Sequence, residues 1–140
     1  MGRRRLGRET AFKALYRIDL VGRGIEDALR DMDPERDGDA DAMAFARELL
    51  ETVAAHRTRL DEVLEGACDR WGLSRTGVVD RALLRLGAAE ILFWKWIPPE
   101  VSIDEYVEIA KKYSSTESAG LVNAVLDRIA REAPSEEVGT

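Results

Sequence analysis

The strongest constraint on the fold is the apolar stretch "VVDRALLRLGAAEILFW" at residues 78–94. Its apolar side chains recur three and four positions apart and mark two faces of a helix rather than one. A helix that is apolar on two sides must be covered by neighbours, so we place it at the centre of the C-terminal half. Glu90 lies on one of these stripes, and because an unpaired buried carboxylate is costly, we expect it to be paired or hydrogen-bonded.

The rest of the sequence shows helical periodicity in separate pieces, and none of it alternates as a strand does. Pro98 and Pro99 end the central helix. Ser102 and Glu105 match the S-x-x-E capping box, which predicts that the next helix starts at Ser102. The other expected helices cover residues 8–20, 25–32, 42–69 and a last stretch that contains residues 121–129.

Polar segments separate these helices. The acidic stretch "DMDPERDGDADA" and the segment "WGLSRTG" are expected to be loops, and the tail "APSEEVGT" is expected to fray. The pattern therefore predicts an all-α protein of about six helices in two lobes, divided near residues 69–76.

The sequence offers little chemistry for catalysis. Cys68 and His56 lie twelve positions apart, or about 18 Å along a helix, so they cannot form a nucleophile–base pair. We interpret His56 as a packed or rim residue and Cys68 as a small hydrophobe at a helix end. The glycines fit no phosphate-binding loop. We expect no enzyme activity, no cofactor and no metal site.

Composition indicates a cytoplasmic location. A single cysteine excludes an internal disulfide, which is typical of a reducing compartment. The run "ILFWKWIPP" is too short to span a bilayer, and the N-terminus lacks the apolar stretch of a secretory signal. We expect no contact with a membrane.

Charge is distributed unevenly along the chain. Residues 1–23 hold seven basic and two acidic side chains, although the whole chain has a net charge of −6. Arginine grips phosphate oxygens bidentately and stacks on bases, and Tyr16 is spaced to lie on the same helix face as Arg8. This basic start favours single-stranded RNA, whose bases are accessible. From the basic start alone, a solubility feature, a membrane-surface contact or disorder remain alternatives.

Four motifs resemble the bacterial NusB family of transcription antitermination factors. They are "RRRLGRETAFKALYRIDL", "VVDRALLRLGAAEIL", "IPPEVSIDEYVEIAKKYS" and "LVNAVLDRI", in this order. The resemblance implies two three-helix bundles packed together, with an N-terminal bundle over residues 1–74 and a C-terminal bundle over residues 75–140. It implies no catalysis. It also implies binding to boxA RNA of nascent transcripts together with the small-subunit ribosomal protein NusE, in a complex that helps RNA polymerase read through terminators.

The resemblance also assigns individual residues. The RNA-binding arm matches Arg4, Arg5 and Arg8, with Arg3 as an added basic residue. A second edge of the RNA site matches the turn into the last helix, where Leu121 replaces an aromatic common in the family. The expected RNA-binding residues are Arg3, Arg4, Arg5, Arg8, Tyr16, Glu117, Ser118 and Leu121, and the expected partner-binding residues are Tyr16, Asp80, Arg81 and Arg85.

Two other functions compete with this one. Trp94 and Trp96 motivate a self-associating protein-interaction module in which the basic arm is incidental, since aromatic residues favour interfaces. A hydrophobic plug that closes the bundle is the simpler interpretation of these tryptophans. A homodimer of the free protein remains open. An RNA-methylating enzyme with a similar N-terminal domain is not expected, because the chain is too short for a cofactor-binding domain.

Overall fold

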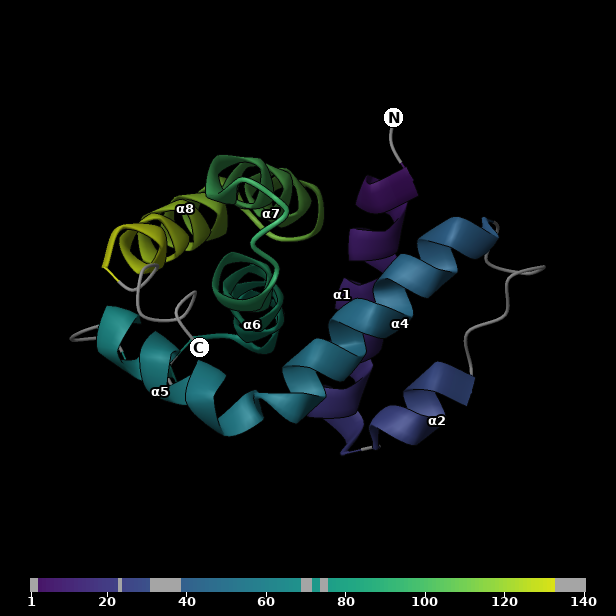
Figure 1. Ribbon diagram of the computed structural model, residues 1–140. Coiled ribbons are helices and arrows are strands. Elements are labelled where there is room, and N and C mark those ends of the chain that lie inside the picture. Colours follow the sequence, from purple (N-terminus) through teal and green to yellow (C-terminus); the bar gives the residue numbers. More distant parts are fainter. Residues whose placement is uncertain (1–2, 23, 31–38, 69–71, 74–75, 133–140) are drawn as a thin grey trace.

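The computed structural model describes residues 3–22, 24–30, 39–68, 72–73 and 76–132. These residues form seven α-helices and no strand (Figure 1). In chain order the helices are α1 (Arg3–Val21), α2 (Ile25–Arg30), α4 (Ala40–Ala55), α5 (Arg57–Cys68), α6 (Val78–Phe93), α7 (Pro99–Tyr113) and α8 (Thr116–Glu132). The predicted all-α fold is confirmed.

Helix α6 is the centre of the molecule. It packs against α1, α4, α5, α7 and α8. Figure 1 shows it between the α1–α4 pair and the α7–α8 pair. Every residue from 82 to 92 is buried, as the two apolar stripes predict. Because both halves of the chain pack on this one helix, α6 fixes the position of α1 relative to α7.

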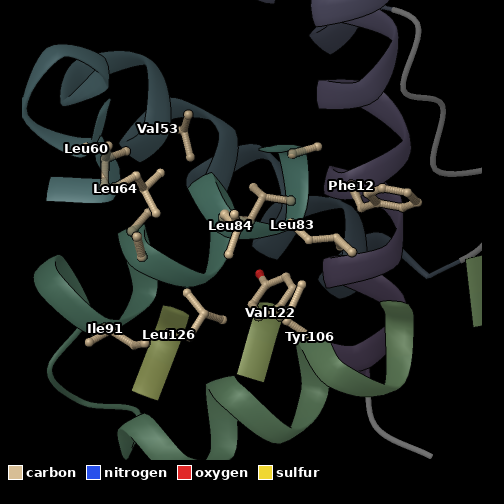
Figure 2. Packing of buried hydrophobic residues seen from close by; sticks show 14 of the residues in the cluster. Phe12, Val53, Leu60, Leu64, Leu83, Leu84, Ile91, Tyr106, Val122 and Leu126 are labelled. Carbon is tan, nitrogen blue, oxygen red and sulfur yellow. The ribbon is translucent and has the colours of Figure 1, made fainter. Parts of the chain in front are cut away.

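A continuous hydrophobic cluster joins the two halves. Phe12 of α1, Leu83 and Leu84 of α6 and Tyr106 of α7 lie in the same packed region, with Leu126 of α8 beyond them (Figure 2). Burial of such side chains stabilises the fold by about 1.5–3 kcal/mol each. The predicted division into domains 1–74 and 75–140 stays a prediction, and its boundary residues lie outside the described part of the chain.

The expected single helix over residues 42–69 is two helices, so this prediction was wrong. His56 separates α4 from α5 with φ −120° and ψ 24°, and its backbone N–H still bonds to the carbonyl of Thr52 at 3.1 Å. The apolar pattern continues through the break without a glycine or proline, which is why periodicity alone missed it. The bend turns α5 toward α6 and α8, both of which it contacts.

Helix α7 begins three residues earlier than the capping box predicts. Pro98 is its N-cap and Pro99 its first residue, a position at which the missing N–H of proline costs nothing. Ser102 is therefore inside the helix and fully buried, and Glu105 faces α1. The S-x-x-E motif was a wrong predictor here because both side chains bind partners on other helices.

The crossing of α1 and α4 depends on a glycine. A Cβ on Gly7 would lie 2.9 Å from the carbonyl oxygen of Ala42 and 2.8 Å from a ring carbon of Phe45. Real side chains do not approach a backbone oxygen so closely without a shift of the helix. Gly7 therefore lets the basic first turns of α1 lie directly against the start of α4.

Candidate nucleic-acid interface

The basic arm, Arg3 to Arg8, forms the first two turns of α1. The helix starts at Arg3, five residues before its predicted start. Positive side chains at a helix N-terminus oppose the helix dipole, so this turn needs compensating carboxylates. Two neighbours supply them: the start of α4 and the middle of α7.

Arg3 docks on the N-terminus of α4. Its Nε donates to Asp39 Oδ2 at 2.6 Å, and its Nη1 lies 3.5 Å from Asp41 Oδ2. Asp39 also caps α4 by accepting from the backbone N–H of Asp41 and Ala42. The hydrogen bond from Arg3 lowers the pKa of Asp39 below its ordinary value. The Arg3 side chain is nevertheless 69% exposed, so it remains accessible to an anion.

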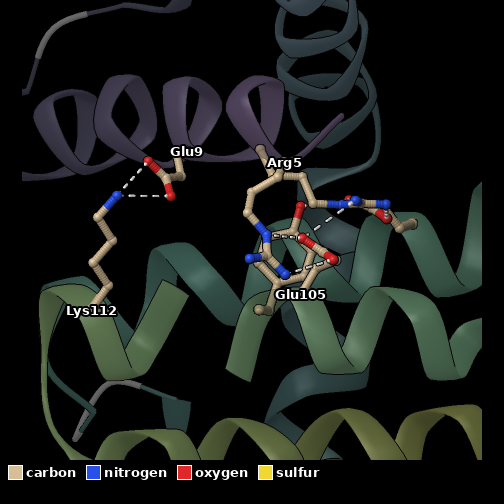
Figure 3. Close-up of polar contacts among 7 residues, drawn as sticks. Arg5, Glu9, Glu105 and Lys112 are labelled. Carbon is tan, nitrogen blue, oxygen red and sulfur yellow. Dashed lines mark hydrogen bonds and ion pairs between the residues drawn. The ribbon is translucent and has the colours of Figure 1, made fainter. Parts of the chain in front are cut away.

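Arg5 forms a bidentate ion pair with Glu105 of α7: its Nε donates to Oε1 at 2.7 Å and its Nη2 to Oε2 at 2.9 Å (Figure 3). This hydrogen bonding lowers the pKa of Glu105 below its ordinary value. One turn further along α1, Glu9 accepts from Lys112 at 3.2 Å and from the hydroxyl of Tyr113 at 3.1 Å. These contacts hold α1 alongside α7 and leave the Arg5 side chain 33% exposed.

Arg8 is buried in the core, unlike the other arginines of the predicted RNA-binding set. Its side chain is only 2% exposed, and its Nε and Nη2 each bond to a carboxylate oxygen of Glu90 at 2.8 Å. Ser102 and Tyr106 donate to the same carboxylate at 2.6 Å. Burial, together with the adjacent Glu90 charge, raises the pKa of Tyr106 well above its ordinary value, so the hydroxyl stays a donor.

The expectation that Glu90 is paired is confirmed, and its main partner is the arginine that we had assigned to RNA. The pair connects α1 to the central helix α6 inside the core. The enclosed guanidinium of Arg8 donates twice to Glu90 and so has a structural role, and its predicted contact with RNA stays a prediction. Its identity as a member of an arginine cluster gave no signal of this role.

Tyr16 lines a groove beside α1. The cavity has a volume of about 380 Å³, and Tyr16 is half-buried in its wall. Tyr113 and Val79 bring the ends of α7 and α6 into the same groove. Its remaining lining residues are Phe12, Lys13 and Arg17. An apolar floor with exposed cations at the edge fits a partner that carries an apolar side chain and negative charge.

Asp80 and Ser118 bring the predicted partner and RNA surfaces together. The hydroxyl of Ser118 donates to Asp80 Oδ2 at 3.2 Å, which ties the start of α8 to the start of α6. The other carboxylate oxygen, Oδ1, is buried and has no partner in the described part of the chain. Nearby on α8, Glu117 is exposed and Leu121 is half-buried against the core.

Arg81 and Arg85 differ in their availability to a partner. Arg85 is 8% exposed, and its guanidinium binds Asp19 at 2.9 Å and Asp61 at 2.9 Å. It therefore links α1, α5 and α6, and its predicted place on the partner surface stays a prediction. Arg81 is half-buried, donates to the carbonyl of Thr76 and lines an open cavity of about 690 Å³ next to α5.

The residues considered for catalysis lie at the two ends of α5. Cys68 is buried at the end of α5, where desolvation raises its thiol pKa, and His56 is exposed and stacks on Phe93 with ring centroids 3.9 Å apart. Among the residues that the structure describes, no group of three or more metal-binding side chains gathers. None of the helices in the described ranges combines the length and apolarity that crossing a bilayer requires.

Sequence comparison finds close relatives over nearly the whole chain. The model of the NusB family matches residues 5–131. The transcription antitermination protein NusB of Myxococcus xanthus strain DK1622 is 40% identical over 134 residues, which cover 93% of this chain and 96% of the relative. The protein of the same name from Desulfitobacterium hafniense strain Y51 is 41% identical over 128 residues, covering 90% and 86%.

Solved structures give the same result. The fold matches T. maritima NusB with a TM-score of 0.85 and 38% identity, over all of this chain and 99% of the other. It also matches a chain in a crystal structure of the antitermination factors NusB and NusE in complex with dsRNA, with a TM-score of 0.84 and 32% identity. That match covers 92% of this chain and 96% of the other.

Proposed function

This chain belongs to the NusB family, and we propose that it is an RNA-binding transcription antitermination factor which binds boxA RNA together with the ribosomal protein NusE. It is a binding factor and not an enzyme. We further propose that it acts in the bacterial cytoplasm, as part of the antitermination complex on RNA polymerase. The resemblance inferred from the four sequence motifs is confirmed.

The observation that carries this function is the exposed basic turn on a rigid support. Arg3 and Arg4 are exposed on α1, while Arg5 and Arg8 fasten that helix to α7 and α6. A phosphate chain therefore meets cations whose backbone positions are already fixed, which reduces the ordering cost of binding. The solved NusB–NusE structure that contains RNA supports the same two partners.

For the partner NusE we propose the surface around the Tyr16 groove. The unpaired Oδ1 of Asp80 is suited to accept a hydrogen bond that a partner donates, because a buried acceptor without a bond is costly. Arg81 lies one residue further along α6. The second edge of the RNA site, Glu117 with Ser118, adjoins this surface through the Ser118–Asp80 bond.

The test is RNA binding by the purified chain with and without NusE, using boxA RNA, a scrambled RNA of equal length and a boxA duplex. We expect single-stranded boxA to bind best and NusE to strengthen it. Arg3→Ala with Arg4→Ala should weaken binding. Arg47→Ala with Arg131→Ala removes two exposed arginines from other helices and is the matched control. Equal binding of boxA and scrambled RNA would refute the proposal.

Self-association is the second candidate function. Of the two tryptophans that suggested it, one is buried. Trp94 is 7% exposed and donates to the Thr52 hydroxyl at 3.1 Å, so it plugs the bundle. Trp96 is 56% exposed and remains as motivation for a homodimer. Light scattering of the free protein distinguishes the two functions: a tight dimer that RNA does not dissociate would favour the interaction module.

A further inference from the structure

An exposed aromatic stack lies beside the basic arm. Trp96 belongs to the turn between α6 and α7, and its ring stacks on Trp94 with centroids 5.3 Å apart and an angle of 26°. Trp94 in turn packs edge-on against Phe45 of α4 at 5.3 Å. Because Trp94 is buried and Trp96 is 56% exposed, the outer indole is held in a fixed orientation at the surface.

Arg4 connects this stack to the arm. Its guanidinium carbon lies 5.0 Å from the centre of the Trp96 ring. The other three arginines of the arm each bind a carboxylate, namely Asp39, Glu105 or Glu90. Among the described residues, Arg4 has no carboxylate within ion-pair distance. Its cation therefore rests on an aromatic face and is available to a phosphate.

We infer that Trp96 is a stacking platform for an unpaired base of the bound RNA, with Arg4 holding the adjoining phosphate. This inference rests on the proposed function and extends the RNA surface onto the α6–α7 turn. The chemistry is that of single-strand recognition, in which an aromatic face and a cation take consecutive parts of one nucleotide. A polyanion suits this surface, because no carboxylate in the described part of the chain pairs with the cation beside the indole.

Base stacking on an indole is stronger than an exposed cation–π contact, so a base can replace the Arg4 guanidinium on the Trp96 ring. An exposed cation–π contact changes the equilibrium constant for forming that contact by a factor of about two to five. Stacking of a base on an aromatic side chain changes the affinity for a single strand by about 5- to 150-fold, as judged by alanine substitution. Arg4 also gains a charged hydrogen bond to phosphate when it leaves the ring. The exchange is therefore favourable.

The experiment measures boxA RNA affinity of Trp96→Ala and Trp96→Phe in complex with NusE. We expect Trp96→Ala to weaken binding about 5- to 150-fold without changing its salt dependence, since no phosphate contact is removed. Trp96→Phe should retain most of the affinity because an aromatic face remains. Val101→Ala, an exposed apolar residue of α7, is the control and should bind like the parent. Circular dichroism verifies that each variant is folded.

Fluorescence gives an independent readout. RNA should quench tryptophan emission of the parent protein, and Trp96→Phe should lose most of this quenching while it still binds. If Trp96→Ala binds RNA like the parent, the platform is refuted and the proposed function stands. If it instead weakens NusE binding without RNA or alters the oligomeric state, Trp96 belongs to a protein interface and the inference is wrong. If the parent binds no RNA, the proposed function itself fails.

Discussion

Substitution of Glu90 by leucine should destabilise the protein more than any surface change. The carboxylate is completely buried and accepts four hydrogen bonds, two from Arg8 and one each from Ser102 and Tyr106. Removing one partner of a buried ion pair costs about 3–5 kcal/mol because the other charge is left uncompensated. The two hydroxyls lose their acceptor and add about 1–3 kcal/mol.

A double-mutant cycle isolates the ion pair from the other losses. Arg8→Met alone should also cost about 3–5 kcal/mol, because it leaves the Glu90 carboxylate without its cation. Arg8→Met combined with Glu90→Leu leaves no uncompensated charge and should be more stable than either single variant. The free energy of unfolding that the double variant still lacks then comes from the hydroxyls of Ser102 and Tyr106, which have lost their acceptor.

The assay is urea unfolding followed by far-ultraviolet circular dichroism, with the free energy of unfolding obtained by linear extrapolation. Domains are stable by only about 5–15 kcal/mol, so the single variants should have clearly lower midpoints. If the double variant lost as much free energy of unfolding as the sum of the two single losses, the reasoning that the pair interacts in the core would be refuted.

Three further predictions follow from the packing and charges. Gly7→Ala should lower the free energy of unfolding by about 1–3 kcal/mol, despite the better helix propensity of alanine, because the new methyl meets a backbone oxygen of α4; equal urea midpoints would contradict it. Glu105→Gln should destabilise at pH 7, and the difference should shrink as the pH falls through the lowered pKa of Glu105, since its pairing with Arg5 stabilises only the ionised form; a difference independent of pH would contradict it. Cys68 should react with iodoacetamide only as fast as the protein unfolds, because it is buried with a raised pKa; rapid alkylation of the folded protein would contradict it.

Periodicity predicted the parts of the fold that depend on burial. Residues 78–94 are apolar on two faces, and this alone placed α6 in the centre and Glu90 in the core. Periodicity gave no information on the break at His56, because the apolar stripe continues on both sides and no helix-breaking residue marks it. Such a bend is decided by how α5 packs on α6 and α8, which is a tertiary effect.

Charge composition marked the start of α1 as basic, but it did not indicate which of its arginines are exposed and which are paired. Arg3 and Arg4 are exposed as expected, whereas Arg8 is enclosed by Glu90, a residue 82 positions away in the chain. Arg85 is likewise withdrawn from the surface by its bonds to two aspartates. Local sequence cannot distinguish a cation that binds a ligand from one that pairs with a distant carboxylate, because both occur in the same kind of pattern.

The aromatic pair of the "WKWIPP" corner illustrates the same limit. Trp94 and Trp96 are two positions apart, yet one is 7% and the other 56% exposed. The sequence marked both as interface candidates, and only the packing of α4 against this turn separates them.

The salt dependence of RNA binding tests the account most directly, because it counts phosphate contacts. The logarithm of the boxA binding constant, with NusE present, is measured against the logarithm of salt concentration for the parent and for Arg3→Ala with Arg4→Ala. A single strand changes this slope by about 0.7 for each phosphate contact, so the variant should have a slope shallower by about 1.4. A slope equal to that of the parent would show that the first turn of α1 does not hold the RNA backbone.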